Sequence, residues 1–470
     1  MKRLLFVAGL VPLLMFSSLG FAAPTGGPGV PIVFQLPQGI SPTGVFVQFL
    51  NTAGTMSGYY LDAKGTRKPL RVNKAYSMAE ITGSQSVGGG APANMPAVYI
   101  TNFISGRIYI NYGKTGLSNL GGSYQPNPSQ PNDANYAVRY QYFEINGKSG
   151  AVTTNLSYID LTAIPLSLQA INAPHASNNP QNTTARGIPL AAAAGTSATS
   201  PNSNVLPSPA SMLPNPQFTR VISPQWAGTA YHDWTNYLQS TLQGKTVLLA
   251  GFFAGVGNQP SGNPLTQAQS YDFAVTFNQA GDATFTAQPD SGNGSAACVP
   301  KSMQGPGVGA TNQTVTITFA DLNAHVGIYG NNPSYTINNN GSIIHTPGIL
   351  NDFFGRVVGD LLAGLSFGFP GSSVNFNGQP IGGLSSTQWW GGILPNGTAV
   401  SLQNTPAGQN IAFAKAQPGQ PLNYHTYAGS LSGLTSGYGF PLQDRLGTNL
   451  LQFNTQQDAN SYLQVSINPD

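Results

Sequence analysis

Charged side chains are nearly absent from this chain, and their scarcity limits the folds open to it. Of 470 residues, 18 are Lys or Arg and 15 are Asp or Glu. That is 7%, against about 25% in an ordinary globular domain. Coiled coils and helical bundles need Glu and Lys in quantity, so both are excluded. Eighteen scattered cations also form no basic patch, so no nucleic-acid partner is expected.

The uncharged residues indicate what the chain does form. Hydrophobic residues make up 40% and aromatic residues 10%, so the chain is not disordered overall. Its surface must then be covered by Asn, Gln, Ser, Thr and Gly. Such a surface suits an extracellular, largely β protein with a neutral, hydroxylated partner.

The N-terminus has the pattern of a secretory signal peptide. Lys2 and Arg3 form the charged region, and residues 4–14 form an apolar stretch too short to span a bilayer. We expect cleavage after Ala22, although a retained membrane anchor is the alternative. Removal of residues 1–22 predicts a secreted protein, extracellular or periplasmic, with no membrane association.

Metal and disulfide chemistry are both poorly supported. Cys298 is the single cysteine, so stability must come from the hydrophobic core, and its apolar neighbours indicate a buried filler. The five histidines are dispersed, with no pair at metal-ligand spacing. We expect no metal and no cofactor.

Short strands separated by Gly, Pro and Asn dominate the first part of the mature chain. They predict a β-barrel or sandwich domain over residues 23–171. Residues 172–216 are rich in Pro, Ser and Asn and read as a linker or insertion. The predicted strands cover residues 30–35, 44–50, 97–103, 107–112, 136–145 and 154–168.

Residues 217–437 mix helical and strand patterns and predict a second, mixed α/β domain. The clearest helix covers residues 351–365, with Asn351 as its expected N-cap. Residues 438–470 predict C-terminal strands that can return to the barrel. The fold class is therefore mainly β with α+β. The further predicted elements are helices at 226–242 and 424–434 and strands at 245–253, 271–277 and 314–319.

The placement of the acids is the strongest chemical signal. The chain has two glutamates, Glu80 and Glu144. Glu144 lies in an aromatic strand, where period-two alternation puts Tyr140 and Tyr142 on its face. Asp160 follows on the expected return strand. Two carboxylates in different environments are what glycoside hydrolysis requires.

Two competing hypotheses remain open. Glu144 and Asp160 can each simply pair with a cation such as Arg107 or Arg139, since structural ion pairs also occupy such positions. Separately, Ser366 lies in a G-x-S-x-G pattern typical of serine esterases. That elbow needs a strand before it, whereas Ser366 follows a predicted helix.

Aromatic side chains bear on sugar binding, because apolar sugar faces stack on flat rings. Trp389 and Trp390 are adjacent, and we expect one of them to face outward as a platform for substrate. Trp226 and Trp234 lie near a predicted helix and are expected in the core.

The segment around the two acids resembles the central motif of glycoside hydrolase family 64, the bacterial β-1,3-glucanases that look like thaumatin-like proteins. The resemblance rests on Tyr142-Phe-Glu144-Ile, followed by an Asn-x-Ser strand that leads through Asp160 to Ile-Pro-Leu. Residues 105–109, 125–132 and 438–444 are also similar to the family. The resemblance thus covers most of the mature chain, with residues 172–216 as an apparent insertion.

This resemblance implies a thaumatin-like β-barrel and a mixed α/β domain with a wide groove between them. It implies a monomeric enzyme that hydrolyses β-1,3-glucan polysaccharide or oligosaccharide with inversion and endo action. Glu144 would be the general acid and Asp160 the general base. The candidate substrate-binding residues are Tyr140, Tyr142, Asn146, Asn155, Arg107, Trp389, Trp390 and Asp444.

The chain also departs from the family pattern. It has Asn146 where the family commonly has Thr, and Val152 and Thr153 where an aromatic residue is common. These departures affect subsite preference and product length. The alternative function is a non-catalytic glucan-binding or cell-wall-interaction protein on the same scaffold, but retention of both Glu144 and Asp160 favours the enzyme.

Overall fold

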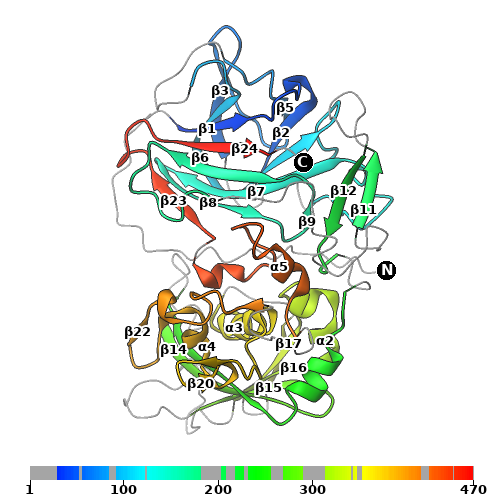
Figure 1. The fold of residues 1–470 in the computed structure, drawn as a ribbon, viewed down its shortest axis with the longest axis vertical. Helices are drawn as coiled ribbons and strands as arrows, with labels where there is room; N and C mark the ends of the chain where they lie inside the picture. Colours follow the sequence, from blue (N-terminus) through cyan, green and yellow to red (C-terminus); the bar gives the residue numbers. More distant parts are fainter. Residues whose placement is uncertain are drawn as a thin grey trace. The chain divides into compact units, whose positions relative to one another are not determined.

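The computed structural model describes residues 29–51, 56–83, 92–121, 124–181, 203–207, 217–226, 231–255, 268–288, 313–339, 342–346, 352–413, 423–447 and 449–468. The predicted signal peptide and Cys298 lie outside these residues. The chain divides into two compact units (Figure 1). The barrel unit comprises the described residues up to 226, together with 430–439 and 449–468. The mixed unit comprises those from 231 to 429, together with 440–447.

One eleven-stranded sheet forms the body of the barrel unit. Its main path runs β10-β24-β1-β6-β7-β8-β23, with β2 and β3 also paired to β6, β4 to β3, and β5 to β2. The C-terminal strand β24 lies parallel to β1, which shows how the chain end returns to this sheet. The strands are β1 (Val30–Gln35), β2 (Val45–Asn51), β3 (Met56–Leu61), β4 (Arg67–Pro69), β5 (Ala75–Ser77), β6 (Ala97–Tyr112), β7 (Arg139–Lys148), β8 (Ala151–Ser157), β10 (Leu166–Ile171), β23 (Leu451–Asn454) and β24 (Tyr462–Ile467).

A short segment nearly closes this sheet into a barrel. Gln181 bridges to Leu168 of β10, and Ser177 bridges to Gln452 of β23, so the two end strands are joined through residues 177–181. The Gln181 side chain is fully buried; it accepts from the Leu156 amide at 3.1 Å and donates to the Asn449 carbonyl at 2.6 Å. The predicted mainly β class is confirmed, while the thaumatin-like detail and the groove stay predictions.

The strand predictions need two corrections. Residues 97–103 and 107–112 belong to one strand, β6, which continues through an irregularity between Phe103 and Gly106. Conversely, the predicted strand 154–168 is three strands, because β9 (Leu161–Thr162) leaves the main sheet. β9 pairs with β12 (Gln217–Ile222), which pairs with β11 (Ser203–Pro207). Asp160 therefore lies in a bend between β8 and β9, and not on a return strand.

The same pairing moves the domain boundary. β12 follows the predicted linker in sequence, yet it belongs to the barrel unit. The structure divides the chain after residue 230, whereas the predicted second domain begins at residue 217.

The mixed unit is built on an antiparallel sheet of six strands in sequence order. One face is apolar and buried, as at Val247, Phe285 and Val315, while the alternate positions carry partly exposed threonines. Alternation of this kind is typical of an antiparallel sheet with one solvated face. Its strands are β13 (Thr246–Phe253), β14 (Gln269–Phe277), β15 (Ala283–Ala287), β16 (Gln313–Ile317), β17 (Tyr335–Asn339) and β18 (Ser342–Thr346).

The central helix of this unit, α3 (Phe353–Phe367), is buried along nearly its whole length. Its N-cap is Asp352, whose side chain accepts from the Gly355 amide at 2.9 Å. The predicted cap, Asn351, lies outside the described residues. Asp and Asn cap helices about equally well, so the sequence pattern alone does not separate the two neighbours.

The other helices are shorter than the sequence pattern predicts. In its described residues, 226 and 231–242, the first predicted helix is helical near its end, at η3 (Tyr237–Thr241). The predicted helix 424–434 is α5 (Thr426–Leu431). None of the described helices is long and apolar enough to cross a membrane. The remaining elements are η1 (Pro42–Gly44), α2 (Phe319–Asn323), η7 (His325–Tyr329), β19 (Asn375–Phe376), β20 (Gln379–Pro380), η8 (Ile381–Gly383), α4 (Ser386–Trp390), β21 (Gly392–Ile393), β22 (Ala399–Val400), η9 (Leu402–Asn404) and η11 (Gln443–Leu446).

Candidate active site

Three neighbouring strands of the barrel unit bring polar side chains into one row. Arg107 of β6 lies opposite Glu144 of β7, which lies opposite Asn155 of β8. Residues that are paired directly across antiparallel strands project from the same face. Arg107 Nε donates to Glu144 Oε1 at 3.1 Å, and Asn155 Nδ2 donates to Oε2 at 3.3 Å. Each oxygen of Glu144 thus accepts one hydrogen bond.

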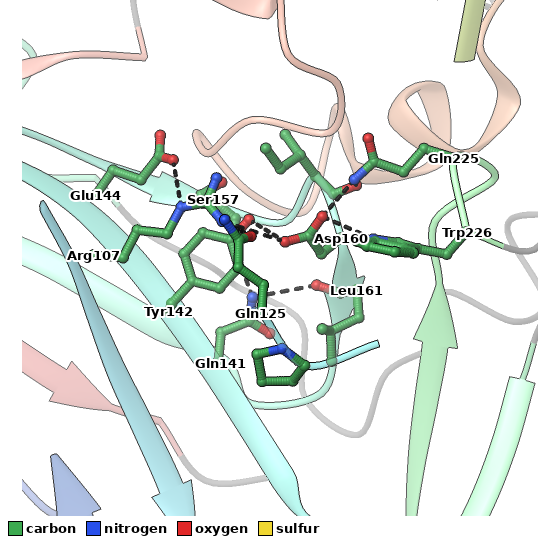
Figure 2. A network of polar contacts seen from close by, with 12 residues as sticks. Arg107, Gln125, Gln141, Tyr142, Glu144, Ser157, Asp160, Leu161, Gln225 and Trp226 are labelled. Carbon is green, nitrogen blue, oxygen red and sulfur yellow. Dashed lines mark hydrogen bonds and ion pairs between the residues drawn. The ribbon is translucent and has the colours of Figure 1, made fainter. Parts of the chain in front are cut away.

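Asp160 is held in its bend by donors from three directions (Figure 2). The Tyr142 hydroxyl donates to Asp160 Oδ2 at 2.7 Å. Trp226 Nε1 donates to Oδ1 at 2.8 Å, and Gln225 Nε2 donates to the same oxygen. The Asp160 side chain is only 11% exposed, so this carboxylate is buried and its orientation is fixed.

Gln141 fixes the backbone around Asp160. Its Nε2 donates to the carbonyls of Ser157 and Leu161 at 2.9 and 3.2 Å, and its Oε1 accepts from the Ala163 amide at 3.1 Å. The side chain is fully buried. One glutamine of β7 therefore ties both ends of the bend to the main sheet.

Arg107 joins the two carboxylates. Its Nη1 lies 3.9 Å from Asp160 Oδ2, while its Nε bonds Glu144. The guanidinium lies over the Tyr142 ring, with Cζ 4.7 Å from the ring centroid, and Nη1 donates to Gln125 Oε1 at 2.6 Å. Since one guanidinium contacts both carboxylates, they are separated by no more than that group and two contact distances.

The charge state of this cluster follows from its surroundings. Burial acts to lower the pKa of Arg107, but Tyr142, Glu144, Tyr109 and Asp160 outweigh it and place the pKa well above its ordinary value. Burial raises the pKa of Tyr109 to about 12 and that of Tyr142 well above its ordinary value. Arg107 is therefore charged, and Tyr142 keeps the proton that it donates to Asp160.

Strand β12 and the segment after it support the cluster. Arg220 of β12 donates to the carbonyls of Pro128 and Tyr136 at 2.9 and 2.7 Å, which secures the loop that carries Gln125. The Ser223 amide donates to the Asp160 carbonyl at 3.0 Å, just before Gln225 and Trp226. A single segment, β12 and the residues directly after it, thus supports both the Gln125 loop and Asp160.

The alternative hypothesis was that Glu144 and Asp160 each form a structural ion pair with Arg107 or Arg139, and the structure shows part of it. Arg107 does pair with Glu144 and approaches Asp160. Arg139 pairs with neither; its Nε donates to the Ala163 carbonyl at 2.9 Å. A simple ion pair needs one acid for each base, whereas here one arginine serves two acids, and Asp160 takes three further donors.

Two other predicted substrate-binding residues lie on β7 near the cluster. Tyr140 is buried, and its hydroxyl donates to the Pro126 carbonyl at 3.4 Å. Asn146 is partly exposed, and its Oδ1 has no hydrogen-bond partner in the described part of the chain. The unpaired Oδ1 atom of Asn146 is itself buried.

Trp389, Trp390 and Asp444 belong to the mixed unit. The prediction that one tryptophan faces outward is wrong, because Trp389 is 0% and Trp390 3% exposed. Trp389 packs on Phe369 and donates to the Ile381 carbonyl at 2.9 Å. Neither ring offers a face to solvent, and Asp444 is also buried.

The serine esterase hypothesis fails on geometry. Ser366 lies in the last turn of α3 and is fully buried. Its hydroxyl accepts from Asn331 Nδ2 at 3.2 Å and faces the Ile328 carbonyl. A nucleophile elbow must expose its serine at a strand-to-helix turn.

In the described residues, no group of three His, Cys, Asp or Glu side chains could hold a metal ion.

Sequence reasoning missed Gln125, Gln225 and Trp226. Trp226 was expected in the core; the structure instead bonds its indole to Asp160, and Trp234 alone is the core residue of that pair. No local signal marks Gln225 and Trp226, because Pro224 restricts only the residue before it, Ser223.

Two neighbouring acids joined by an arginine on a mostly β scaffold fit the carboxylate pair that glycoside hydrolases use. Residues 35–244 match the family model described as β-1,3-glucanase, glycoside hydrolase family 64. The matched range contains Glu144, Asp160 and the described residues whose side chains hydrogen-bond or ion-pair with them. The predicted family resemblance is confirmed over residues 35–244, which are similar to family 64.

Known proteins give further points of comparison. Among curated proteins, none matches the chain. The chain is similar to the crystal structure of a laminaripentaose-producing β-1,3-glucanase in complex with laminaritetraose, at 13% identity and a TM-score of 0.48, over 94% of this chain and 99% of that one. It is also similar to a family 64 β-1,3-glucanase domain from Clostridium beijerinckii, at 11% identity and a TM-score of 0.41, over 95% and 100% of the two chains.

Proposed function

We propose that the chain is a secreted, inverting endo-β-1,3-glucanase. One observation carries the proposal: Glu144 and Asp160 both contact the guanidinium of Arg107, at 3.1 and 3.9 Å. The family match supports β-1,3-glucan as the substrate. The low charge of the chain also suits a neutral polysaccharide.

The proposed reaction is a single displacement. Asp160 takes a proton from a water molecule as its oxygen attacks the anomeric carbon. The bond from that carbon to the glycosidic oxygen breaks, and the bonding electron pair stays on the oxygen, which takes a proton from protonated Glu144. Inverting enzymes place the two carboxyl groups about 6.5–9.5 Å apart so that the water fits between substrate and base. A pair spanned by one guanidinium suits a separation of this order.

The direct test measures reducing-sugar release from laminarin. Glu144→Gln removes the acid proton at nearly constant shape and is expected to reduce kcat by at least about 100-fold. Glu80→Gln is the matched control, because Glu80 is the other glutamate and is bound to Lys74 and Tyr60. It should leave kcat unchanged. Activity retained in Glu144→Gln would refute the assignment.

Product analysis tests the finer claims. Proton NMR of early products should show the α-anomer first, as inversion requires. Thin-layer analysis on laminarin and curdlan should show a spread of sizes from the start, as endo action requires, with no products from cellulose or chitin. Release of only one small product would contradict endo action.

Two further outcomes address the alternative function and secretion. A wild-type protein that binds curdlan but releases nothing between pH 4 and 8 would favour the non-catalytic glucan-binding protein.

For secretion, N-terminal sequencing of protein exported from a bacterial host should begin at Ala23. Full-length protein retained in the membrane fraction would support an uncleaved anchor.

A further inference from the structure

The two oxygens of Asp160 have different surroundings. Oδ1 accepts from both Trp226 Nε1 and Gln225 Nε2. Among the residues that the structure describes, Oδ2 accepts only from the Tyr142 hydroxyl, at 2.7 Å, with Arg107 Nη1 further away at 3.9 Å. A carboxylate has about four lone-pair sites, two on each oxygen. Oδ1 is therefore filled, while Oδ2 can accept one more hydrogen bond.

The two oxygens of Asp160 also face different neighbours. Oδ2 is the oxygen that approaches Arg107, and Arg107 in turn bonds Glu144. The open acceptor site of Asp160 is thus on the oxygen next to the Arg107–Glu144 pair. Oδ1 is turned toward the segment after β12, which carries Gln225 and Trp226 (Figure 2).

Resting on the proposed function, we infer that Gln225 and Trp226 are positioning residues that occupy Oδ1 of Asp160 and so make Oδ2 the atom that takes the proton from the attacking water. The proton passes from water to Oδ2, the water oxygen bonds the anomeric carbon, and the leaving oxygen takes the proton of Glu144. Without the two donors, a water molecule can bond either oxygen, and the carboxylate can rotate away from the reactive geometry. Neither Gln225 nor Trp226 needs to touch substrate.

Their placement by the fold supports this role. Gln225 Nε2 also donates to the Ile159 carbonyl at 3.0 Å, so the same amide fixes the backbone beside Asp160. The pairing of β12 with β9, immediately after Asp160, sets the approach of this segment. The titratable groups around Asp160 are Arg107, Tyr142, Tyr109, Tyr140 and Glu144.

The test compares pH profiles of kcat on laminarin for the wild type and for Trp226→Phe, Gln225→Met and Gln225→Glu. Hydrogen bonds to a charged carboxylate favour that form, so losing one donor should shift the acidic limb upward by about half a pH unit. Gln225→Glu replaces the donor with a like charge and should shift it by about one unit or more. We expect kcat to fall about tenfold in the first two variants, with KM within about twofold, since these donors act through the general base.

Trp234→Phe is the control for the loss of an indole. Its Nε1 has no partner in the described residues, and the ring is buried in the mixed unit. This variant should leave the pH profile in place even where its melting temperature falls. A pH profile that stays in place in Trp226→Phe and in both Gln225 variants, or a loss confined to KM, would overturn the inference.

The outcomes separate the inference from the proposed function. If the wild type releases no sugar, the proposed function fails and the inference falls with it. If the wild type is active and Glu144→Gln is not, but the acidic limb stays fixed in Trp226→Phe and both Gln225 variants, only the inference is overturned. Upward shifts that are larger in Gln225→Glu than in Gln225→Met support it.

Discussion

Arg107 and Glu144 face each other across β6 and β7, with Nε and Oε1 3.1 Å apart. Their side chains are only 13% and 15% exposed. The guanidinium also approaches Asp160 and lies over the ring of Tyr142. One largely buried cation thus lies between two acidic side chains and contacts both.

Replacement of Arg107 should therefore reduce both the stability of the protein and its activity. Arg107→Met leaves two carboxylates without their cation and is expected to destabilise the protein by about 3 kcal/mol, as for a broken buried ion pair. Arg107→Lys keeps the charge but cannot contact both acids at once. It should therefore be more stable and more active than Arg107→Met, but less so than the wild type. Urea unfolding and kcat on laminarin measure both effects. Arg71→Met, at an exposed position, is the control, and equal stability of the Arg107 and Arg71 variants would contradict the prediction.

Asn155 orients Glu144 from the opposite strand. Asn155→Asp replaces the donor to Glu144 Oε2 with a like charge, and like charges directly opposite each other on neighbouring strands repel. We expect at least a tenfold loss of kcat, measured on laminarin. Asn155→Ala removes the donor without adding charge and should lose less. The prediction fails if the alanine variant is the weaker enzyme.

Two buried histidines make the mixed unit sensitive to acid. Burial lowers the pKa of His232 to about 4 and that of His425 to about 3, from an ordinary value of 6.5. The unfolded chain therefore binds these protons first, and stability is lost as pH falls from 6.5 toward about 4. The loss is about 1.4 kcal/mol per pH unit for each histidine.

His425→Phe isolates one of these contributions. Phenylalanine cannot titrate, and it keeps a ring to stack on Phe440, whose centroid lies 5.5 Å away. The plot of unfolding free energy against pH should flatten by about 1.4 kcal/mol per unit between pH 4 and 6.5. Tryptophan fluorescence can follow it, since Trp234, Trp389 and Trp390 lie in the mixed unit. An unchanged slope would show that His425 is not buried in the neutral form.

Asp360 is the centre of a second charged cluster, in the core of the mixed unit. Its carboxylate lies 3.4 Å from both Arg356 and Arg445 and accepts from Ser386 and Tyr271. Burial raises the pKa of Asp360, while Arg356 acts in the opposite direction.

Asp360→Asn is expected to destabilise the protein by about 3 kcal/mol, because it removes the buried carboxylate that both Arg356 and Arg445 contact. Urea unfolding gives the value. Asp62→Asn, in a turn where the side chain is 28% exposed and an amide oxygen can still accept from the Lys64 and Thr66 amides, should change stability little. A comparable effect of the two substitutions would mean that the Asp360 cluster contributes no specific stabilisation.

Much of the site was predictable because its elements are local. Period-two alternation put Glu144 on an aromatic strand, and the short turn between β7 and β8 brings Asn155 opposite it. The strand at 245–253 and the helix near 351–365 were also found, since both carry regular apolar spacing. Family resemblance added the roles of the two acids, which alternation alone does not supply.

Other features depended on distant residues. Asp160 was expected on a strand, but β9 turns away to pair with β12, a strand some 60 residues later in sequence. That long-range pairing places Gln225 and Trp226 on Asp160. Trp389 and Trp390 were expected to divide between core and solvent, yet packing around α3 buries both.

The sequence by itself determined the mainly β character, the scarcity of charge and the strand face that carries Glu144. Each follows from the backbone period and from the solvation of neighbouring residues, which act over a few positions. Only the tertiary structure decided that Arg107 spans both acids and that one oxygen of Asp160 is filled. Those facts depend on which remote segments pack together, because hydrogen bonds and burial are set by distance in space and not by separation along the chain.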